Sequence, residues 1–235
     1  MAAFQRDQQK LPRYSYREHV LTRKDNTRDG RTLEVWYVHG RPVNETIALD
    51  SRALNPGEIA AEHARFCQRM AAAAKRSPPP LGELEFAGHS YPFARLAHDY
   101  VYRNRRTIVW HGRTSWVYDA VPNPAVHARS REETLLLHSA GEVYVDAADE
   151  HLVRLALHST STVRYGLGVL ADIHQASFAI SLRRFAPRVW LPAQTDFHLR
   201  ATVLLLGHII RGKRQSFFDY SILSGSTAAA AGCSR

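Results

Sequence analysis

Apolar and polar residues alternate along much of the chain, and Gly141–Leu157 shows this pattern in its clearest form. The stretch opens with two alternating valines, passes through the acidic run Asp146–Glu150, and resumes its alternation at Val153. Two period-two runs on either side of a short polar break predict a β-hairpin. Asp146 and Asp149 are interpreted as turn-forming residues rather than as paired catalytic carboxylates, because such side chains cap backbone groups where a chain reverses.

The same alternation predicts about nine or ten antiparallel strands in the whole chain. The predicted strands are Tyr14–Lys24, Thr32–Val38, Val43–Leu49, Arg106–Trp110, Thr114–Val121, the two arms of the hairpin above, Gln175–Ala186, Val189–Leu206 and Ile209–Ile222. Consecutive hairpins of this kind indicate a mainly β (α+β) fold built on a curved, meandering antiparallel sheet. One face is apolar and the other is polar and basic, so the sheet must curl or be covered to bury its apolar face.

One main helix is predicted at Asn55–Arg76. Asn55 can cap it, Pro56 suits the first helical position, and Glu58 completes a capping box. Its apolar stripe consists of Ile59, Phe66, Met70 and Ala74. Because the stripe is thin and rich in alanine, we expect this helix to act as a lid on the sheet rather than to anchor its own core. Short helical segments, such as one at Ser130–Leu137, would add to this lid.

A single domain is predicted at residues 13–223, because all-β folds of this length often form one domain. Residues 1–12 are polar and expected to be flexible, and the small-residue tail at 224–235 is expected to be disordered. Cys67 falls in the predicted helix and Cys233 in this tail. A structural disulfide between the two cysteines is therefore not expected.

The sequence leaves the cellular compartment open. It has no apolar run of about 18 residues, which a transmembrane helix would need. The N-terminal residues also lack the apolar core of a signal peptide. Read literally, the chain would be cytoplasmic, and the alternative is an export signal that lies upstream of Met1 or has been removed.

Positive charge exceeds negative charge, with 31 Lys and Arg against 22 Asp and Glu and a net charge of +9. Many of the excess arginines fall within predicted strands, which favours a basic sheet face over a basic arm. Such a face would suit an anionic membrane surface, although the charge could equally serve solubility. Aromatic residues are interleaved with these arginines, but no RNA-binding signature accompanies them, so no nucleic-acid partner is expected.

No complete catalytic or metal-binding motif is present. The 13 histidines are scattered, without H-E-x-x-H or H-x-H spacing, and G-x-S-x-G and Walker A motifs are absent. We therefore expect no metal, no cofactor and no catalytic residues. Glu18 and Glu45 fall on the apolar sides of their strands, where a carboxylate needs a partner or has a raised pKa. We expect strand curvature to expose both, or an arginine to pair with them, while burial stays open as the alternative.

Several segments resemble one bacterial family over about Arg13 to Ile222. These segments are YSYREHV, DGRTLEVWYVHGRPV, NPGEIAAEHARF, VWHGRTSWVYDAVPNP, GEVYVDAADEHLVRLAL, RVWLPAQTDFHLRATVLL and FFDYS. They are similar to the outer-membrane lipoprotein-sorting-like proteins, the family of the LolA and LolB carriers and the sensor RseB. The resemblance implies an unclosed half-barrel, lined by apolar side chains and lidded by helices, that in the carriers holds lipoprotein acyl chains. This chain has no lipobox cysteine, and no carrier residue that governs release can be placed in it.

The resemblance and the alternation together predict a non-catalytic periplasmic protein that binds a lipid or a lipoprotein acyl chain in the concave face of a half-barrel. The alternatives are an envelope protein-interaction or stress-sensor module and an unrecognised hydrolase. The predicted lining residues are Tyr16, Val20, Val35, Tyr37, Trp116, Val143, Val145, Val153, Leu155, Phe178, Ile180, Phe197 and Leu199. The predicted lid residues are Ile59, Phe66 and Met70.

Overall fold

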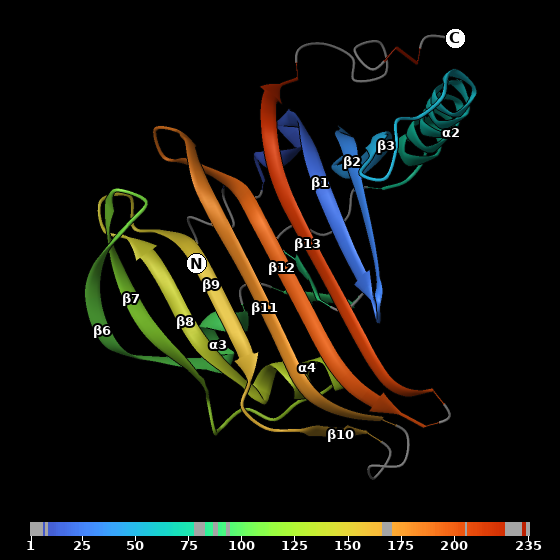
Figure 1. Cartoon of the computed structure of the whole chain (residues 1–235). Coiled ribbons are helices and arrows are strands. Elements are labelled where there is room, and N and C mark those ends of the chain that lie inside the picture. The colour runs from blue at the N-terminus through green and yellow to red at the C-terminus, as the bar shows by residue number, and fades with distance from the viewer. Residues whose placement is uncertain are drawn as a thin grey trace.

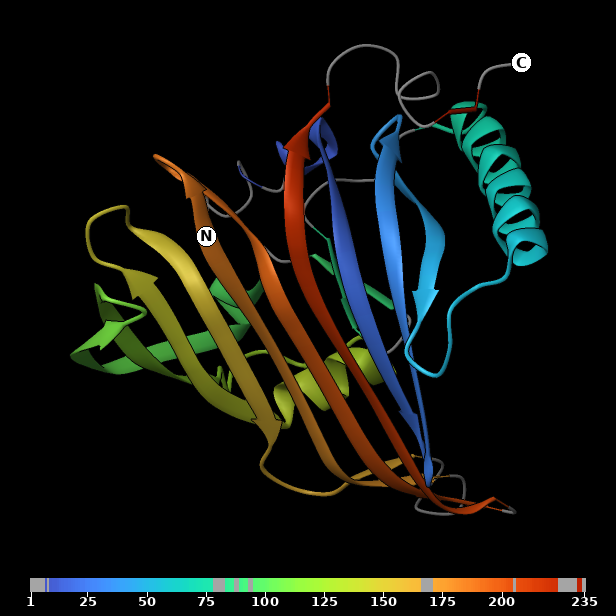
Figure 2. The same cartoon turned by 45° about the horizontal axis from the view of Figure 1, so that its top comes forward.

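A computed structural model describes residues 7, 9–77, 83–86, 89–92, 95–165, 171–204, 206–223 and 232–233. These residues form one antiparallel sheet of 11 strands that does not close on itself, together with a separate two-stranded hairpin. The large sheet curls around two short helices, α3 and α4 (Figures 1 and 2). The prediction of a mainly β fold built on an unclosed half-barrel is therefore confirmed.

The elements of the large sheet are mostly longer than the alternation predicted. Its strands are β1 (Tyr14–Lys24), β2 (Thr27–Val38), β3 (Arg41–Leu49), β6 (Tyr100–Trp110), β7 (Arg113–Pro122), β8 (Ser139–Asp146), β9 (His151–Ser159), β10 (Val163–Tyr165), β11 (Ala171–Ala186), β12 (Val189–Val203) and β13 (Gly207–Ile222). The separate hairpin consists of β4 (Glu83–Phe86) and β5 (His89–Pro92). The helices are η1 (Leu11–Arg13), α2 (Pro56–Ala74), α3 (Leu96–Asp99) and α4 (Arg131–Leu137).

The strand order is β3-β2-β1-β13-β12-β11-β9-β8-β7-β6, with β10 pairing separately to β11. Most neighbours are consecutive hairpins, as the sequence predicts. The exceptions are the β9–β11 pair, whose strands are separated in the sequence by β10, and the β1–β13 pair, which joins the first described strand to the last. This long-range pair lies in the interior of the sheet, so the N-terminal meander extends the same curved surface instead of forming a second layer.

Two of the tight turns have the same sequence and the same backbone conformation. His39-Gly40 connects β2 to β3, and His111-Gly112 connects β6 to β7. All four residues have positive φ angles, between 48° and 74°. Positive φ at both central positions is the mark of a type I′ turn, whose twist matches that of the strands that it connects. Glycine adopts this conformation without strain, which explains why it occupies the second position in both turns.

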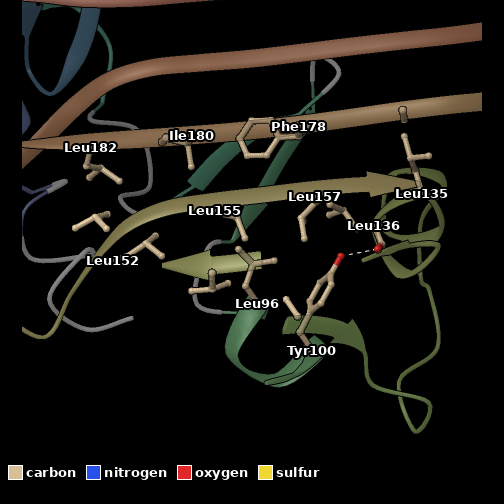
Figure 3. Packing of buried hydrophobic residues seen from close by; sticks show 14 of the residues in the cluster. Leu96, Tyr100, Leu135, Leu136, Leu152, Leu155, Leu157, Phe178, Ile180 and Leu182 are labelled. Atoms are coloured by element: carbon tan, nitrogen blue, oxygen red, sulfur yellow. Dashed lines mark hydrogen bonds between the residues drawn. The ribbon is translucent and has the colours of Figure 1, made fainter. Parts of the chain in front are cut away.

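The main core lies between the β8–β9–β11 part of the sheet and the two helices α3 and α4. Figure 3 shows Leu155, Leu157 and Phe178 facing side chains from the helical segments. Tyr100, at the start of β6, donates a hydrogen bond from its hydroxyl to the backbone carbonyl of Leu136. The sheet face that carries this core is called the inner face below.

Helix α2 begins as the sequence predicts, with a complete capping box between Asn55 and Glu58. It packs Phe66 and Met70 against Val43 and the partly buried Trp36 and Val38. Successive residues of a strand point to opposite faces, so Trp36 and Val38 lie on the face opposite their neighbours Val35 and Tyr37. The expectation that this helix covers the apolar face with the predicted lining residues is therefore wrong. It packs on the outer face at the β2–β3 edge, and Ile59 is 53% exposed.

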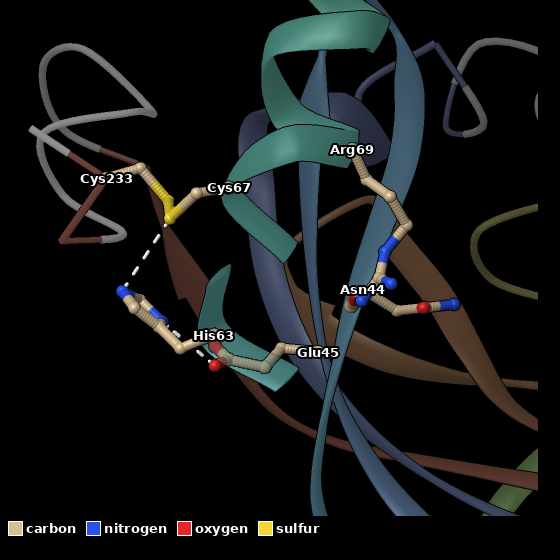
Figure 4. The surroundings of a disulfide bond; sticks show 6 residues. All are labelled: Asn44, Glu45, His63, Cys67, Arg69 and Cys233. Atoms are coloured by element: carbon tan, nitrogen blue, oxygen red, sulfur yellow. Dashed lines mark hydrogen bonds and ion pairs between the residues drawn. A yellow bond between two sulfur atoms is a disulfide. The ribbon is translucent and has the colours of Figure 1, made fainter. Parts of the chain in front are cut away.

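Cys67 of α2 forms a disulfide with Cys233, 166 residues further along the chain (Figure 4). The expectation of no structural disulfide is therefore wrong. Sequence spacing could not reveal the pair, because it depends on the tail passing next to α2 in space. The bond attaches the end of the chain to the helix. Residues 224–231, 234 and 235 of the tail predicted to be disordered lie outside the described residues.

The N-terminal segment is attached to the beginnings of β9 and β12 through Asp7. Asp7 is buried, and its carboxylate accepts a hydrogen bond from the backbone N–H of Trp190 at 2.8 Å. It also lies 3.2 Å from His151 Nε2 and 2.7 Å from Lys10 Nζ. The predicted flexibility of residues 1–12 thus does not extend to Asp7, whereas residues 1–6 and 8 lie outside the described residues.

Candidate ligand-binding face

The strand register places the predicted lining residues of different strands on one face of the sheet. Residues directly opposite each other in an antiparallel pair project to the same side. These opposite pairs are Tyr16–Val35, Val145–Trp116, Phe178–Phe197, Phe178–Leu157, Ile180–Leu155 and Val143–Leu155. The alternation in the sequence therefore marks one continuous inner face that extends from β2 to β7.

This inner face is closed at its two ends and more open between them. One end is the main core beneath α3 and α4, and the other is a smaller cluster of Tyr16, Val20, Leu33 and Val35. Of the predicted lining residues, Tyr16, Val20, Val35, Val143, Val153, Leu155, Phe178 and Ile180 are buried. Those that stay partly exposed are Tyr37, Trp116, Val145, Phe197 and Leu199. Accessible apolar surface on this face therefore lies mainly at the partly exposed residues.

A polar strip crosses the inner face between the two apolar clusters. Gln215 donates a hydrogen bond from its side-chain amide to Glu18 at 3.1 Å, and Thr195 donates from its hydroxyl to Gln215 at 3.3 Å. The three side chains come from β1, β13 and β12. They form a chain of donors and acceptors, and the cationic side chains of Lys213 and Arg31 project to the same face, opposite Phe197 and Val20.

Glu18 is only 7% exposed, so the expectation of an exposed or arginine-paired carboxylate is wrong for this residue. Burial raises its pKa, while the positive charges of Lys213 and Arg31 and the hydrogen bond from Gln215 act in the opposite direction. Burial also raises the pKa of the nearby Tyr37 hydroxyl to about 12, so this group stays protonated. The sequence alone identified Glu18 but not Gln215.

Replacement of Glu18 by glutamine is expected to stabilise the protein at pH 7. The folded state raises the pKa of Glu18 above its unfolded value of about 4.5, so the folded state binds the proton more tightly. The stability that the Glu18 carboxyl group contributes is fully present below pH 4.5 and is lost as the pH rises through its folded-state pKa. Urea unfolding at pH 4 and pH 7 would measure this, and an equal difference between variant and wild type at both pH values would contradict it.

Glu45 lies on the outer face and pairs with a histidine rather than with an arginine. Its carboxylate is 2.9 Å from Nδ1 of His63 on α2 (Figure 4). Nε2 of the same ring is 3.7 Å from the sulfur of Cys67. His63, Cys67 and Cys233 gather within 4.8 Å, but the disulfide removes both thiolates that a metal would need. This cluster therefore holds α2 and the tail against β3.

Asp146 and Asp149 occupy the β8–β9 turn, as interpreted from the sequence. Asp146 accepts hydrogen bonds from the backbone N–H groups of Ala148 at 3.1 Å and Asp149 at 2.8 Å, which confirms its turn-forming role. The sequence did not reveal the ion pair that Asp146 also makes with Arg113, at 2.6 and 2.9 Å. This arginine belongs to the neighbouring β6–β7 hairpin, so the pair joins two successive hairpins.

Solved structures that match this chain cover almost all of it at low similarity. They include an outer-membrane lipoprotein-sorting protein domain from Vibrio parahaemolyticus, which is 9% identical with a TM-score of 0.36 over 97% of this chain and 95% of that chain. A DUF1329 family protein from Desulfovibrio piger is 10% identical with a TM-score of 0.33 over 97% of this chain and 93% of its own. The MucA/MucB complex from Pseudomonas aeruginosa matches at 8% identity and a TM-score of 0.24, over 98% of this chain and 96% of that chain.

The lipoprotein-sorting domain and MucB are proteins of the kind that the sequence resemblance indicates. No family model and no curated protein matches the sequence. At these identities and TM-scores the likeness carries no functional assignment, which must come from the residues of this chain. In the described part of the chain, no helix combines the length and apolar character needed to span a membrane.

Proposed function

We propose that the protein is a non-catalytic periplasmic carrier that binds the acyl chain of a lipid or lipoprotein on its inner face. The observation that supports this most directly is the set of apolar side chains on β12 and β13 that stay partly exposed between the two buried clusters. Phe197 and Leu199 pack against the edge of the main core, and Phe217 and Tyr220 pack against the smaller cluster.

An acyl chain would gain enough free energy on such a surface to bind without any catalytic machinery. Burial contributes about 0.8 kcal/mol per CH₂ group, or roughly 12 kcal/mol for a fully covered C16 chain. The strip formed by Glu18, Gln215 and Thr195 would accept the polar end of the molecule. The remaining predicted lining residues, including Leu155 and Phe178, would act as the floor that gives this surface its shape.

The proposed compartment is supported by the disulfide. Disulfides persist in oxidising environments such as the bacterial periplasm and are rare in the cytosol. The Cys67–Cys233 bond therefore favours export of the protein. Attraction to an anionic membrane surface would depend on arginines that lack an acidic neighbour, because Arg211 pairs with Asp25 and Arg214 pairs with Asp196.

Phe197→Ser is expected to weaken binding of a fluorescent fatty acid by about tenfold or more, which corresponds to about 1.4 kcal/mol of lost contact. His198→Ser provides a matched control, because His198 is the next residue of β12 and projects to the opposite face. The affinity of the His198→Ser variant for the fatty acid should stay within about twofold of that of wild type.

Native mass spectrometry of protein purified from a bacterial host, with lipid extraction, would show whether a lipid is bound. Absence of bound lipid together with no fatty-acid uptake would exclude the carrier. Equal effects of the two substitutions would show that the inner face is not the site. Capture of a specific envelope protein in place of a lipid would support the alternative of an interaction or stress-sensor module.

A further inference from the structure

A pocket of about 680 Å³ opens at the end of the sheet where three hairpins meet. These are the β6–β7, β8–β9 and β11–β12 hairpins, whose turns lie at the same end of the molecule (Figure 1). The β9–β11 pairing ends at Arg154 and Ser181, although β11 continues to Ala186. Both residues line the pocket, so it lies where these two neighbouring strands separate.

Positive charge predominates in this pocket. Its lining includes Arg113, Arg154, Arg183 and Arg184, and the acids that form ion pairs with them within the described residues are Asp146 and Asp149. Four guanidinium groups and two carboxylates leave a net charge of +2. Arg113 and Arg184 pair with these aspartates, but Arg154 and Arg183 form no ion pair in the described part of the chain.

Trp110 in the pocket wall carries a buried indole N–H group. The indole Nε1 of Trp110 is buried and has no hydrogen-bond partner among the described residues. Buried N–H groups are nearly always paired, so this donor stands out as unsatisfied among the described residues. Arg154 lies over the same indole ring, 5.4 Å from its centroid, and donates a hydrogen bond to Ser181 at 3.1 Å.

The Arg113 guanidinium is held in place before any ligand arrives. Asp146 fixes the Arg113 guanidinium through two hydrogen bonds, and its own position is fixed by the backbone of the β8–β9 turn. Arg113 in turn lies over the ring of Trp190, at 5.7 Å. The Trp190 indole donates to Asp149 at 3.1 Å. A site with locked side chains binds more tightly because less conformational freedom is lost.

We propose that this pocket binds a phosphate group that carries an apolar or aromatic substituent. The planar guanidinium fork matches phosphate oxygens, and the net charge of +2 balances a phosphate dianion better than a carboxylate. The volume lies within the range of sites for small organic ligands and exceeds what a bare phosphate needs. Apolar walls from Val153, Leu182 and Trp190 would hold the substituent.

Isothermal titration with phenyl phosphate, inorganic phosphate and phenol tests the proposal. Phenyl phosphate should bind more tightly than inorganic phosphate, and phenol should not bind. The double variant Arg154→Gln/Arg183→Gln should lose at least about tenfold in affinity for phenyl phosphate. Arg105→Gln is the matched control, because Arg105 also lies over a tryptophan, Trp116, at 5.6 Å but does not line the pocket.

Equal binding of phenol and phenyl phosphate, no binding of phenyl phosphate, or equal affinities of the double variant and the control would overturn the proposal. If the double variant does not fold, the single variant Arg183→Gln can replace it in the test, because Arg183 is exposed. Phe197→Ser should leave phenyl phosphate binding unchanged, so a failed acyl-chain site and a failed phosphate pocket are distinguishable.

Vesicle flotation separates a lipid headgroup from a soluble phosphate ester as the source of the phosphate. Flotation with phosphatidic acid vesicles but not phosphatidylcholine vesicles, lost in the double variant, would support the pocket with a lipid ligand. Phenyl phosphate binding without flotation would support it with a soluble ester. If the double variant floats with the vesicles as well as wild type does and also binds phenyl phosphate equally well, the proposal is contradicted.

Discussion

Asp146→Ala is expected to lower the free energy of unfolding by about 3 kcal/mol, because it removes one partner of a buried ion pair. Asp146 is 1% exposed and accepts two hydrogen bonds from Arg113 and two from backbone N–H groups of its own turn. Its loss would leave the Arg113 guanidinium without its main partner and the turn without its acceptor. Because Arg113 is partly exposed, the expected loss in free energy of unfolding lies at the lower end of the range for broken buried ion pairs.

The same residue should make stability depend on pH in a defined direction. The hydrogen bonds from Arg113 lower the pKa of Asp146 below its ordinary value of 3.8. A carboxylate whose folded-state pKa is depressed contributes stability that is present above its unfolded pKa and is lost as the pH falls through the folded value. Wild type should therefore lose stability below about pH 4, whereas Asp146→Asn should not show this pH-dependent loss of stability.

Urea unfolding of wild type, Asp146→Ala and Asp146→Asn at pH 7 and pH 3 would measure both effects. Asp119→Ala is a suitable control, because Asp119 forms an exposed ion pair with Arg106. Such surface pairs contribute about 0 to 1 kcal/mol. If Asp146→Ala costs no more than Asp119→Ala, the pair between the two hairpins does not stabilise the fold.

The features that the sequence predicts well are those that depend on neighbouring residues. Alternation identified the inner-face residues, because the side-chain period of a strand is a local property. The capping box at Asn55 and the His-Gly turns depend only on residues a few positions apart. Even the error in the start of β2, which was predicted at Thr32 but lies at Thr27, concerns neighbouring residues. The chain turns at Asp25 and Asn26 alone, since Thr27 and Gly30 already pair with β1.

The features that the sequence could not predict depend on contacts between distant segments. Glu18 and its partner Gln215 are 197 positions apart, and they meet only because β1 pairs with β13. The sequence also cannot predict the face of the sheet on which α2 packs, because the apolar stripe of Phe66 and Met70 on this helix would fit an apolar surface on either face. The arginine pocket combines residues from three hairpins, none of which contains a binding motif by itself.

Leu155→Ala should lower the free energy of unfolding by about 3 kcal/mol, within the range of 2 to 5 kcal/mol for truncated core leucines. Leu155 is 2% exposed in the middle of the main core, between β8 and β11 and beneath α3 and α4. The substitution would leave a cavity that the paired strands cannot close. Leu21→Ala, at a side chain that is 37% exposed, should cost less than about 0.5 kcal/mol and serves as the control.

Leu155→Ala should affect stability much more than it affects ligand binding. If Leu155 belongs to the floor of the inner face, the variant should bind a fluorescent fatty acid nearly as well as wild type under conditions where it is folded. Phe197→Ser should show the reverse, with weaker binding and a smaller loss of stability, because Phe197 is already partly exposed. Equal losses of binding in both variants would show instead that the ligand enters the main core and displaces α3 and α4 from it.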